Sequence, residues 1–263
     1  MHELEQIRAC VCRKLDPACT PLRGVIADAE RETRELLGFG QPQTAAMLTS
    51  AHWAPGKTLR IAFRGGTRAA RRVVMAAALE WMKYANIDIV QVTSGACDIR
   101  CSFDPGGSWS YIGTEILSVP PDQPTMNIGW GPDMPTCLHE LGHTLGLIHE
   151  HQNPQAKIPW DEPAVLAYYA GAPNFWTARQ TIDNVLTVMD PRLLTNGGFD
   201  KHSIMEYPIP AELVTDPSFA VGWNTELSAG DKALIAGLYP GADAKARLEL
   251  GHGIQRDVSG RQG

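Results

Sequence analysis

Residues 137–150 decide the fold of this chain, and they read Cys137-Leu138-His139-Glu140-Leu141-Gly142-His143-Thr144-Leu145-Gly146-Leu147-Ile148-His149-Glu150. On a helix, His139 and His143 stand four residues apart and project from one face, so both imidazoles can reach one cation. Gly146 can adopt the positive φ at which a helix ends, and the turn there can return His149 as a third nitrogen ligand. Three histidines leave a fourth position for water, which is the arrangement of a catalytic zinc ion (Zn2+) rather than a structural one.

Glu140 follows the first of these ligands and can touch a metal-bound water without binding the metal itself. Amide hydrolysis at neutral pH lacks a nucleophile, and zinc lowers the pKa of bound water from about 15.7 toward about 7. Glu140 would take the proton from that water as it attacks the carbonyl, and would later deliver a proton to the leaving amine. The motif therefore predicts a zinc-dependent endopeptidase with one catalytic ion, held by His139, His143 and His149, and with Glu140 as catalytic base and acid.

The composition of the chain excludes several other classes of protein. Its 263 residues include 23 Lys and Arg against 29 Asp and Glu, which gives a net charge of −6. A chain this acidic, with no basic block, is a poor binder of nucleic acids and anionic membranes, so neither is expected as a partner. The longest apolar stretch, residues 73–79, is far too short to cross a bilayer. We expect a monomer whose partner is a polypeptide substrate.

The N-terminal sequence carries no recognisable export signal. The chain opens Met1-His2-Glu3-Leu4-Glu5, without the basic and apolar regions of a secretory signal peptide. Taken alone, this opening predicts a protein that stays inside the cell or leaves it by a non-classical route.

Hydrophobic periodicity predicts a sheet-rich first half and an irregular, helical second half that divide near residue 150. Strands are expected at residues 58–63, 87–92, 99–103, 108–114 and 125–130, and helices at residues 21–37, 67–85, 136–145, 163–169, 175–186 and 228–238. This pattern predicts an α+β fold of two lobes with a cleft between them. Residues 1–50 are expected to form a helical N-terminal extension, and residues 243–263 a flexible tail.

Two motifs together resemble the metzincin zinc endopeptidases: HExxHxxGxxH at residues 139–149, and Ser203-Ile204-Met205-Glu206-Tyr207 downstream. The pair His149-Glu150 points to their astacin-like branch. The segments Pro124-Thr125-Met126-Asn127 and Ala85-Asn86-Ile87 resemble the microbial catalytic domains of that branch. The resemblance covers roughly residues 50–242. It implies a metzincin (zincin-like) fold, with a mixed twisted sheet and the active-site helix in an N-terminal lobe at residues 51–149 and an irregular C-terminal lobe at residues 150–242. It also implies a secreted protein.

The same resemblance assigns roles to the downstream motif. Met205 would lie beneath the zinc site. Tyr207 would be a fifth zinc ligand that can swing out and stabilise the oxyanion of the tetrahedral intermediate. The first 50 residues could then be a removable propeptide, with a packed extension as the alternative.

A substrate-binding strand is the second feature implied by the resemblance. Its residues match the family's edge strand, which pairs antiparallel with an extended substrate through main-chain hydrogen bonds: Trp109, Ser110, Tyr111, Ile112 and Gly113. One departure from the family lies just after the zinc motif. Astacins continue there with a characteristic Arg and Asp run, whereas this chain has His151-Gln152-Asn153-Pro154-Gln155. It is therefore expected to be a relative of the branch rather than a typical animal astacin, with His151 at the rim of the site.

Two further functions are compatible with the motifs. One is a catalytically silent zinc-containing module that binds peptides, although the retained Glu140 argues against it. The other is a zinc amidase acting on non-protein amides, which a strand suited to extended peptides disfavours.

The six cysteines do not predict a disulfide framework. If the extended segment reaches from residue 96 to residue 103, Cys97 and Cys101 lie about 13 Å apart, which is too far for a disulfide. Cys10, Cys12 and Cys19 could form one local bridge near the N-terminus.

Overall fold

A computed structural model describes residues 11–13, 46–48, 50–196 and 198–241 of the chain. Its centre is a mixed six-stranded sheet with the strand order β1-β6-β7-β5-β3-β4. The strands in chain order are β1 (Val11–Arg13), β3 (Thr58–Arg64), β4 (Asp88–Gln91), β5 (Ile99–Ser102), β6 (Trp109–Tyr111) and β7 (Met126–Asn127). Two further strands, β2 (Ala46–Leu48) and β8 (Leu194–Asn196), form a separate antiparallel pair.

Across the six-stranded sheet, the direction of the strands changes once, between β7 and β6. Strands β4, β3, β5 and β7 run parallel, and β6 is antiparallel to β7, with Ser110 opposite Met126. On the other side of β6 lies β1, which runs parallel to it and places Cys12 opposite Ser110. Strand β6 therefore has a neighbour on both sides.

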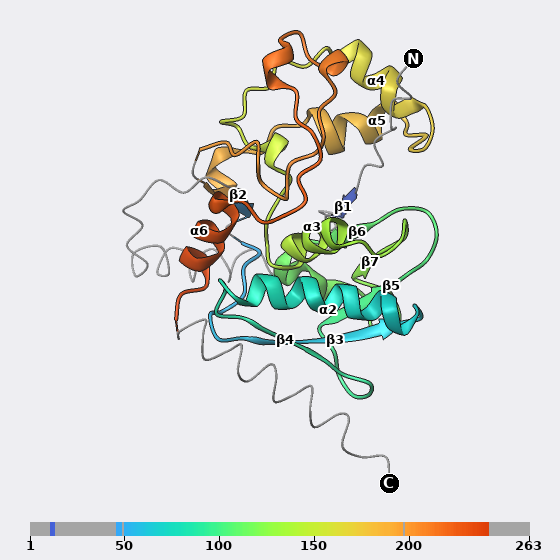
Figure 1. Cartoon of the computed structure of the whole chain (residues 1–263), viewed down its shortest axis with the longest axis vertical. Helices are drawn as coiled ribbons and strands as arrows, with labels where there is room; N and C mark the ends of the chain where they lie inside the picture. The colour runs from blue at the N-terminus through green and yellow to red at the C-terminus, as the bar shows by residue number, and fades with distance from the viewer. Residues whose placement is uncertain (1–10, 14–45, 49, 197, 242–263) are drawn as a thin grey trace.

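Two helices pack together and against the apolar side chains of the sheet. Helix α2 (Arg68–Met82) begins at Thr67, whose side-chain oxygen accepts a hydrogen bond from the backbone N–H of Ala70. Trp81 near its end is fully buried, and its indole N–H donates to the carbonyl oxygen of Leu138 in α3 (Met134–Thr144), at 2.9 Å. This bond satisfies the polar atom of the large core side chain and ties the two helices together. Figure 1 shows α2 in front of β3 and β4, with α3 beyond it toward the centre of the molecule.

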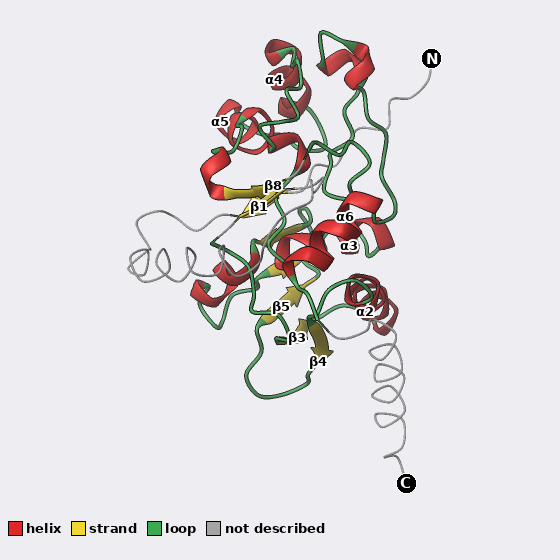
Figure 2. Cartoon of the chain, turned by 90° about the vertical axis from the view of Figure 1, so that its left-hand side faces the viewer, coloured by secondary structure: helices red, strands yellow, loops and turns green. Residues whose placement is uncertain are grey.

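The chain beyond α3 is mostly irregular, with short helices. It includes α4 (Glu162–Ala170), α5 (Ala178–Thr181), which runs on into a π-helical turn (Ile182–Leu186), and the final helix α6 (Ala229–Leu238). A second apolar cluster holds this region together, formed by Val165, Tyr169, Val185, Tyr207 and Leu213. Helix α6 instead contributes Leu234, Ile235 and Leu238 to the main apolar cluster, which also holds side chains of the sheet, α2 and α3. Figure 2 shows α4 and α5 toward the top of the view and α6 nearer its middle.

The observed elements confirm the α+β class and most of the predicted elements within the described residues. The predicted helix 21–37 lies outside those residues, as do Cys10 and Cys19 of the proposed local bridge. Cys97 and Cys101 are free thiols and so are not bridged to each other, as predicted, although Cys97 lies before the start of β5. None of the helices in the described ranges combines the length and the apolar character needed to span a membrane.

The prediction for residues 108–114 is wrong in two respects. The strand ends at Tyr111, and Gly113 starts a 3-10 helix (Gly113–Ser118), so Ile112 and Gly113 are not strand residues. Gly113 has φ +46°, and a Cβ there would fall 1.6 Å from the carbonyl oxygen of Ala51. This close approach to another backbone segment bends the chain out of the sheet. The strand is also not an edge, because β1 covers it.

Candidate metal centre

Helix α3 carries the first two histidines of the motif and starts at a well-defined cap. The side chain of Asp133 accepts a hydrogen bond from the backbone N–H of Thr136 at 2.8 Å, and Pro135 occupies the first turn. From Cys137 to Thr144 every residue of the helix is buried, including His139, Glu140 and His143. The helix therefore brings His139, Glu140 and His143 into the interior of the molecule.

A tight turn then returns the chain toward the helix. The backbone N–H of Gly146 donates to the carbonyl oxygen of His143, and that of Leu147 donates to Gly142. Gly146 has φ +101°, a backbone conformation that favours glycine. Three residues later, His149 is fully buried beside the two histidines of α3.

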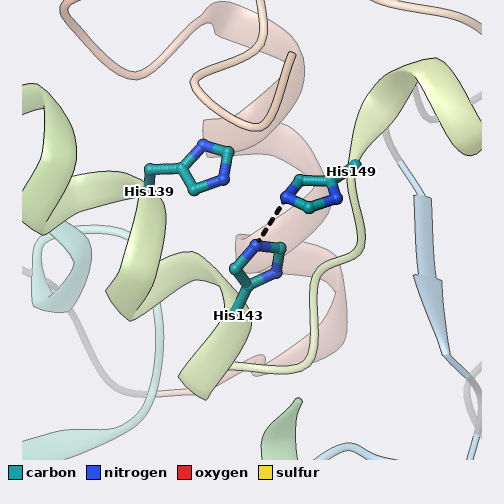
Figure 3. A group of neighbouring side chains, drawn as sticks. All are labelled: His139, His143 and His149. Atoms are coloured by element: carbon teal, nitrogen blue, oxygen red, sulfur yellow. Dashed lines mark hydrogen bonds between the residues drawn. The ribbon is translucent and has the colours of Figure 1, made fainter. Parts of the chain in front are cut away.

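The three histidines form one compact group (Figure 3). Each offers a ring nitrogen, and these nitrogens all lie within 4.8 Å of one another. The Nε2 atoms of His143 and His149 are 3.1 Å apart. Tetrahedral zinc with bonds of about 2.0–2.1 Å places its nitrogen ligands roughly 3.3 Å apart, so the group is close to the spacing that zinc requires.

Backbone carbonyls orient two of the rings. The Nδ1 atom of His139 lies 2.8 Å from the carbonyl oxygen of Ile204, and Nδ1 of His143 lies 2.9 Å from that of Leu147. Since a carbonyl can only accept, Nδ1 carries the proton in both rings and Nε2 keeps its lone pair. Burial lowers the pKa of His139 to about 4, so the ring is neutral at physiological pH. Its Nε2 is buried and makes no hydrogen bond to any described residue. A buried ring nitrogen whose lone pair receives no hydrogen bond is suited to binding a metal ion.

The downstream motif forms a turn under this group, hereafter the Met-turn (residues 203–207). Met205 is buried, and its sulfur would lie 2.4 Å from a Cβ added to Gly142 of α3. The backbone N–H of Glu150 donates to the carbonyl oxygen of Met205 at 3.0 Å. Met205 is thus packed against the helix of the first two histidines and bonded to the residue after the third.

Tyr207 lies within the group of histidine rings. Its ring centroid is 4.4 Å from that of His149 and 6.2 Å from that of His139. The residue is buried and belongs to the second apolar cluster, so it connects the Met-turn with the irregular half of the chain.

The predicted position of His151 is wrong. The predicted place is the rim, but the residue is buried. Its ring stacks on that of His149, with centroids 5.2 Å apart, and contacts the tilted ring of Tyr207, with centroids 4.6 Å apart. Its Nε2–H donates to the carbonyl oxygen of Asn184, and its Nδ1 lies 3.6 Å from the Glu206 carboxylate. Burial raises the pKa of Glu206 well above its ordinary value. No pattern in the sequence marks His151 and Glu206 as partners, because the contact depends on the fold of the Met-turn.

The predicted substrate strand lies next to the metal helix. The hydroxyl groups of Ser110 in β6 and Thr144 in α3 are 3.1 Å apart and both buried. Trp109 and Tyr111 flank Ser110 in the strand and are half-buried. Their rings are perpendicular, with centroids 6.0 Å apart. Ile112 is fully buried in a small cluster with Ala51, so it does not face a substrate groove.

Comparisons with known proteins agree with this architecture. A family model described as Astacin, a peptidase family, matches residues 46–158. A solved structure of myroilysin is 42% identical, with a TM-score of 0.72, and the alignment covers 75% of this chain and 99% of that one.

Two more distant relatives were also found. The structure of high choriolytic enzyme 1, a hatching enzyme zinc-protease from the medaka Oryzias latipes, has a TM-score of 0.52 at 17% identity over 73% of this chain and 95% of that one, and shares the fold. Tolloid-like protein 1 of Homo sapiens is 23% identical over 214 residues, 75% of this chain. The chain spans only 20% of the length of that relative.

Proposed function

The chain belongs to the astacin family of peptidases, and from this premise we propose that it is a zinc-dependent endopeptidase that cleaves polypeptide substrates. The observation that carries the proposal is the convergence of three buried histidines around one point. Glu140 follows the first of them, His139, in α3. Members of this family are typically secreted, and secretion is the destination we propose for this protein as well.

The nitrogen ligands are His139, His143 and His149, and they would hold one zinc ion. When bound, zinc acts as a Lewis acid that polarises the scissile carbonyl and makes water acidic enough to attack at neutral pH. The protein fixes the orientation of two of these rings, His139 and His143, from behind by backbone carbonyls. Such outer hydrogen bonds set the tautomer and raise the basicity of the ligating nitrogen.

Glu140 is the proposed general base and acid. It precedes His143 on the helix and is fully buried, so its carboxylate works in a region of low dielectric. There it takes the proton of the attacking water and passes it to the nitrogen of the departing amine. A side chain that keeps the proton next to the scissile bond avoids a separate exchange with solvent.

Tyr207 is proposed to stabilise the oxyanion of the tetrahedral intermediate, and to bind the metal as a fifth ligand in the resting enzyme. Its ring packs against His149 and lies near His139, so its hydroxyl can act on the same centre. Met205 is proposed to support the ligand group from below through its contact with Gly142.

Strand β6 is the proposed platform for the substrate, through Trp109, Ser110 and Tyr111. An extended peptide would add to this strand in the antiparallel direction by main-chain hydrogen bonds. In the structure, β1 from the first 50 residues already pairs with β6, so the chain's own N-terminal segment occupies that side. We propose that residues 1–50 act as a segment that must leave before substrate can bind.

The decisive experiment is a casein digestion assay on the purified protein, with and without a zinc chelator. Cleavage that is lost on chelation and restored by added zinc is the expected result. Binding of casein fragments without cleavage would support a silent peptide-binding module instead. Hydrolysis of small acyl amides but not of casein would support a zinc amidase.

A further inference from the structure

The carboxylate of Asp231 in the last helix connects that helix to the Met-turn. Asp231 lies in the first turn of α6 and is fully buried. Its Oδ1 accepts a hydrogen bond from the hydroxyl of Ser203 at 2.6 Å, and its Oδ2 accepts one from the backbone N–H of Ile204 at 2.8 Å. A third donor is the backbone N–H of Ser228, at 2.9 Å. Two of these three donors belong to the Met-turn rather than to the helix.

Helix capping alone does not require this arrangement. Ser228 and Asp231 form a capping box, in which each side chain accepts from the backbone N–H of the other. The capping box accounts for only one of the three hydrogen bonds that the Asp231 carboxylate accepts, and it does not require the carboxylate to be buried. A buried carboxylate is costly unless several donors compensate it, and charge-assisted bonds of this kind are the strong ones. The extra donors indicate a role at the Met-turn.

The hydrogen bonds continue from Asp231 to the first histidine. The oxygen of Ser203, whose hydroxyl donates to Asp231, accepts from the backbone N–H of Met205 at 3.0 Å. This N–H belongs to the same planar peptide unit as the carbonyl of Ile204. That carbonyl accepts from Nδ1 of His139 at 2.8 Å. Fixing the N–H side of the peptide therefore fixes the direction of the carbonyl that orients the His139 ring.

We propose that Asp231 is a positioning residue of the metal centre, which holds the Met-turn peptide that aims His139 at the metal. The inference rests on the proposed function, because it treats His139 as a zinc ligand. The same peptide segment also reaches the other side of the site, since the carbonyl of Met205 accepts from the backbone N–H of Glu150, next to His149. A single carboxylate in α6 thus bears on two of the three ligands.

The test compares zinc affinity in three alanine variants, by competition with a chromophoric chelator, with urea unfolding of the zinc-free proteins in parallel. Asp231→Ala should weaken zinc binding about 10-fold or more, as is usual when an outer partner of a ligand is lost. Ser203→Ala leaves the Ile204 bond to Asp231 in place and should give a smaller loss. Ser228→Ala removes the cap of the same helix and a hydrogen bond to Asp200 but keeps both Met-turn donors, so it should lower stability and change zinc affinity less than Asp231→Ala.

A second readout follows the His139 ring directly. In the zinc-free protein, the Nδ1–H signal of His139 in the nitrogen-15 NMR spectrum should be protected from exchange, and Ser203→Ala should weaken that protection. This variant keeps the inference testable if Asp231→Ala does not fold. Equal zinc affinity in the unaltered protein, Asp231→Ala and Ser203→Ala would overturn the inference. An equal loss in Ser228→Ala and Asp231→Ala would overturn it too, since helix stability would then explain the effect. Failure of the unaltered protein to bind zinc would refute the proposed function itself.

Discussion

The phenol ring of Tyr207 lies against the imidazole of His149, with ring centroids 4.4 Å apart. One residue comes from the end of the Met-turn and the other from the turn after α3, and both are buried. This contact puts the phenol ring beside the histidines of the metal centre, and a substitution by phenylalanine can remove the hydroxyl while keeping the ring.

Tyr207→Phe should lower kcat about 100-fold or more while changing KM little. The phenylalanine keeps the packing in the second apolar cluster, and the variant loses only a donor to charge that develops in the transition state. Steady-state kinetics on a fluorogenic peptide would measure both constants. An unaltered kcat would remove Tyr207 from the mechanism.

Glu140→Gln should abolish most peptidase activity while the protein still binds one zinc ion per chain. General acid–base groups contribute about 100- to 10,000-fold, and the amide is close in size to the carboxyl group it replaces. Zinc content would be measured by elemental analysis, next to turnover of denatured casein. Undiminished turnover at full zinc occupancy would disprove the role given to Glu140.

Deletion of residues 1–45 should raise kcat/KM for peptide substrates about 10-fold or more. It removes β1 and its three paired positions on β6, and backbone hydrogen bonds are each worth about 0.5–1.5 kcal/mol. The remaining chain keeps β2, which pairs with β8. Deletion of residues 1–10 is the matched control, because it spares β1. The proposal fails if the two shortened proteins have the same activity.

Gly142→Ala should destabilise the protein by about 1–3 kcal/mol, although alanine normally favours a helix over glycine. The new methyl group would fall 2.4 Å from the sulfur of Met205 and 3.3 Å from the ring of Trp81, both in the closed core. Gly222→Ala is the control, since nothing lies within 4 Å of its added methyl group. Urea unfolding would compare the two. A stabilised Gly142→Ala variant would show that Met205 moves away easily and gives no firm support to α3.

The sequence predicts the helix of the zinc motif well because each of its signals is local. Asp133, the periodic apolar residues and Gly146 together determine where α3 begins and ends. Most strands of the sheet are also located correctly, since their apolar residues are continuous. The family resemblance in turn locates Met205 and Tyr207, which the structure brings next to the histidines.

Long-range contacts explain what the sequence does not predict. The end of β6 depends on the approach of Gly113 to Ala51, and its pairing with β1 joins residues almost a hundred positions apart. The burial of His151 follows from the Met-turn closing over it. Asp231 carries an ordinary capping signal with Ser228, and its bonds to Ser203 and Ile204 appear only in three dimensions.

The position of Asp231 in the last described helix affects the order in which the metal centre is completed during synthesis. Translation delivers the three histidines first and the last helix only near the end of the described chain. A growing polypeptide would therefore contain His139, His143 and His149 before it contains Asp231, which we propose holds the Met-turn peptide that orients His139. A chain that ended before α6 would lack the carboxylate that holds the Met-turn, so we expect it to bind zinc less tightly than the full chain.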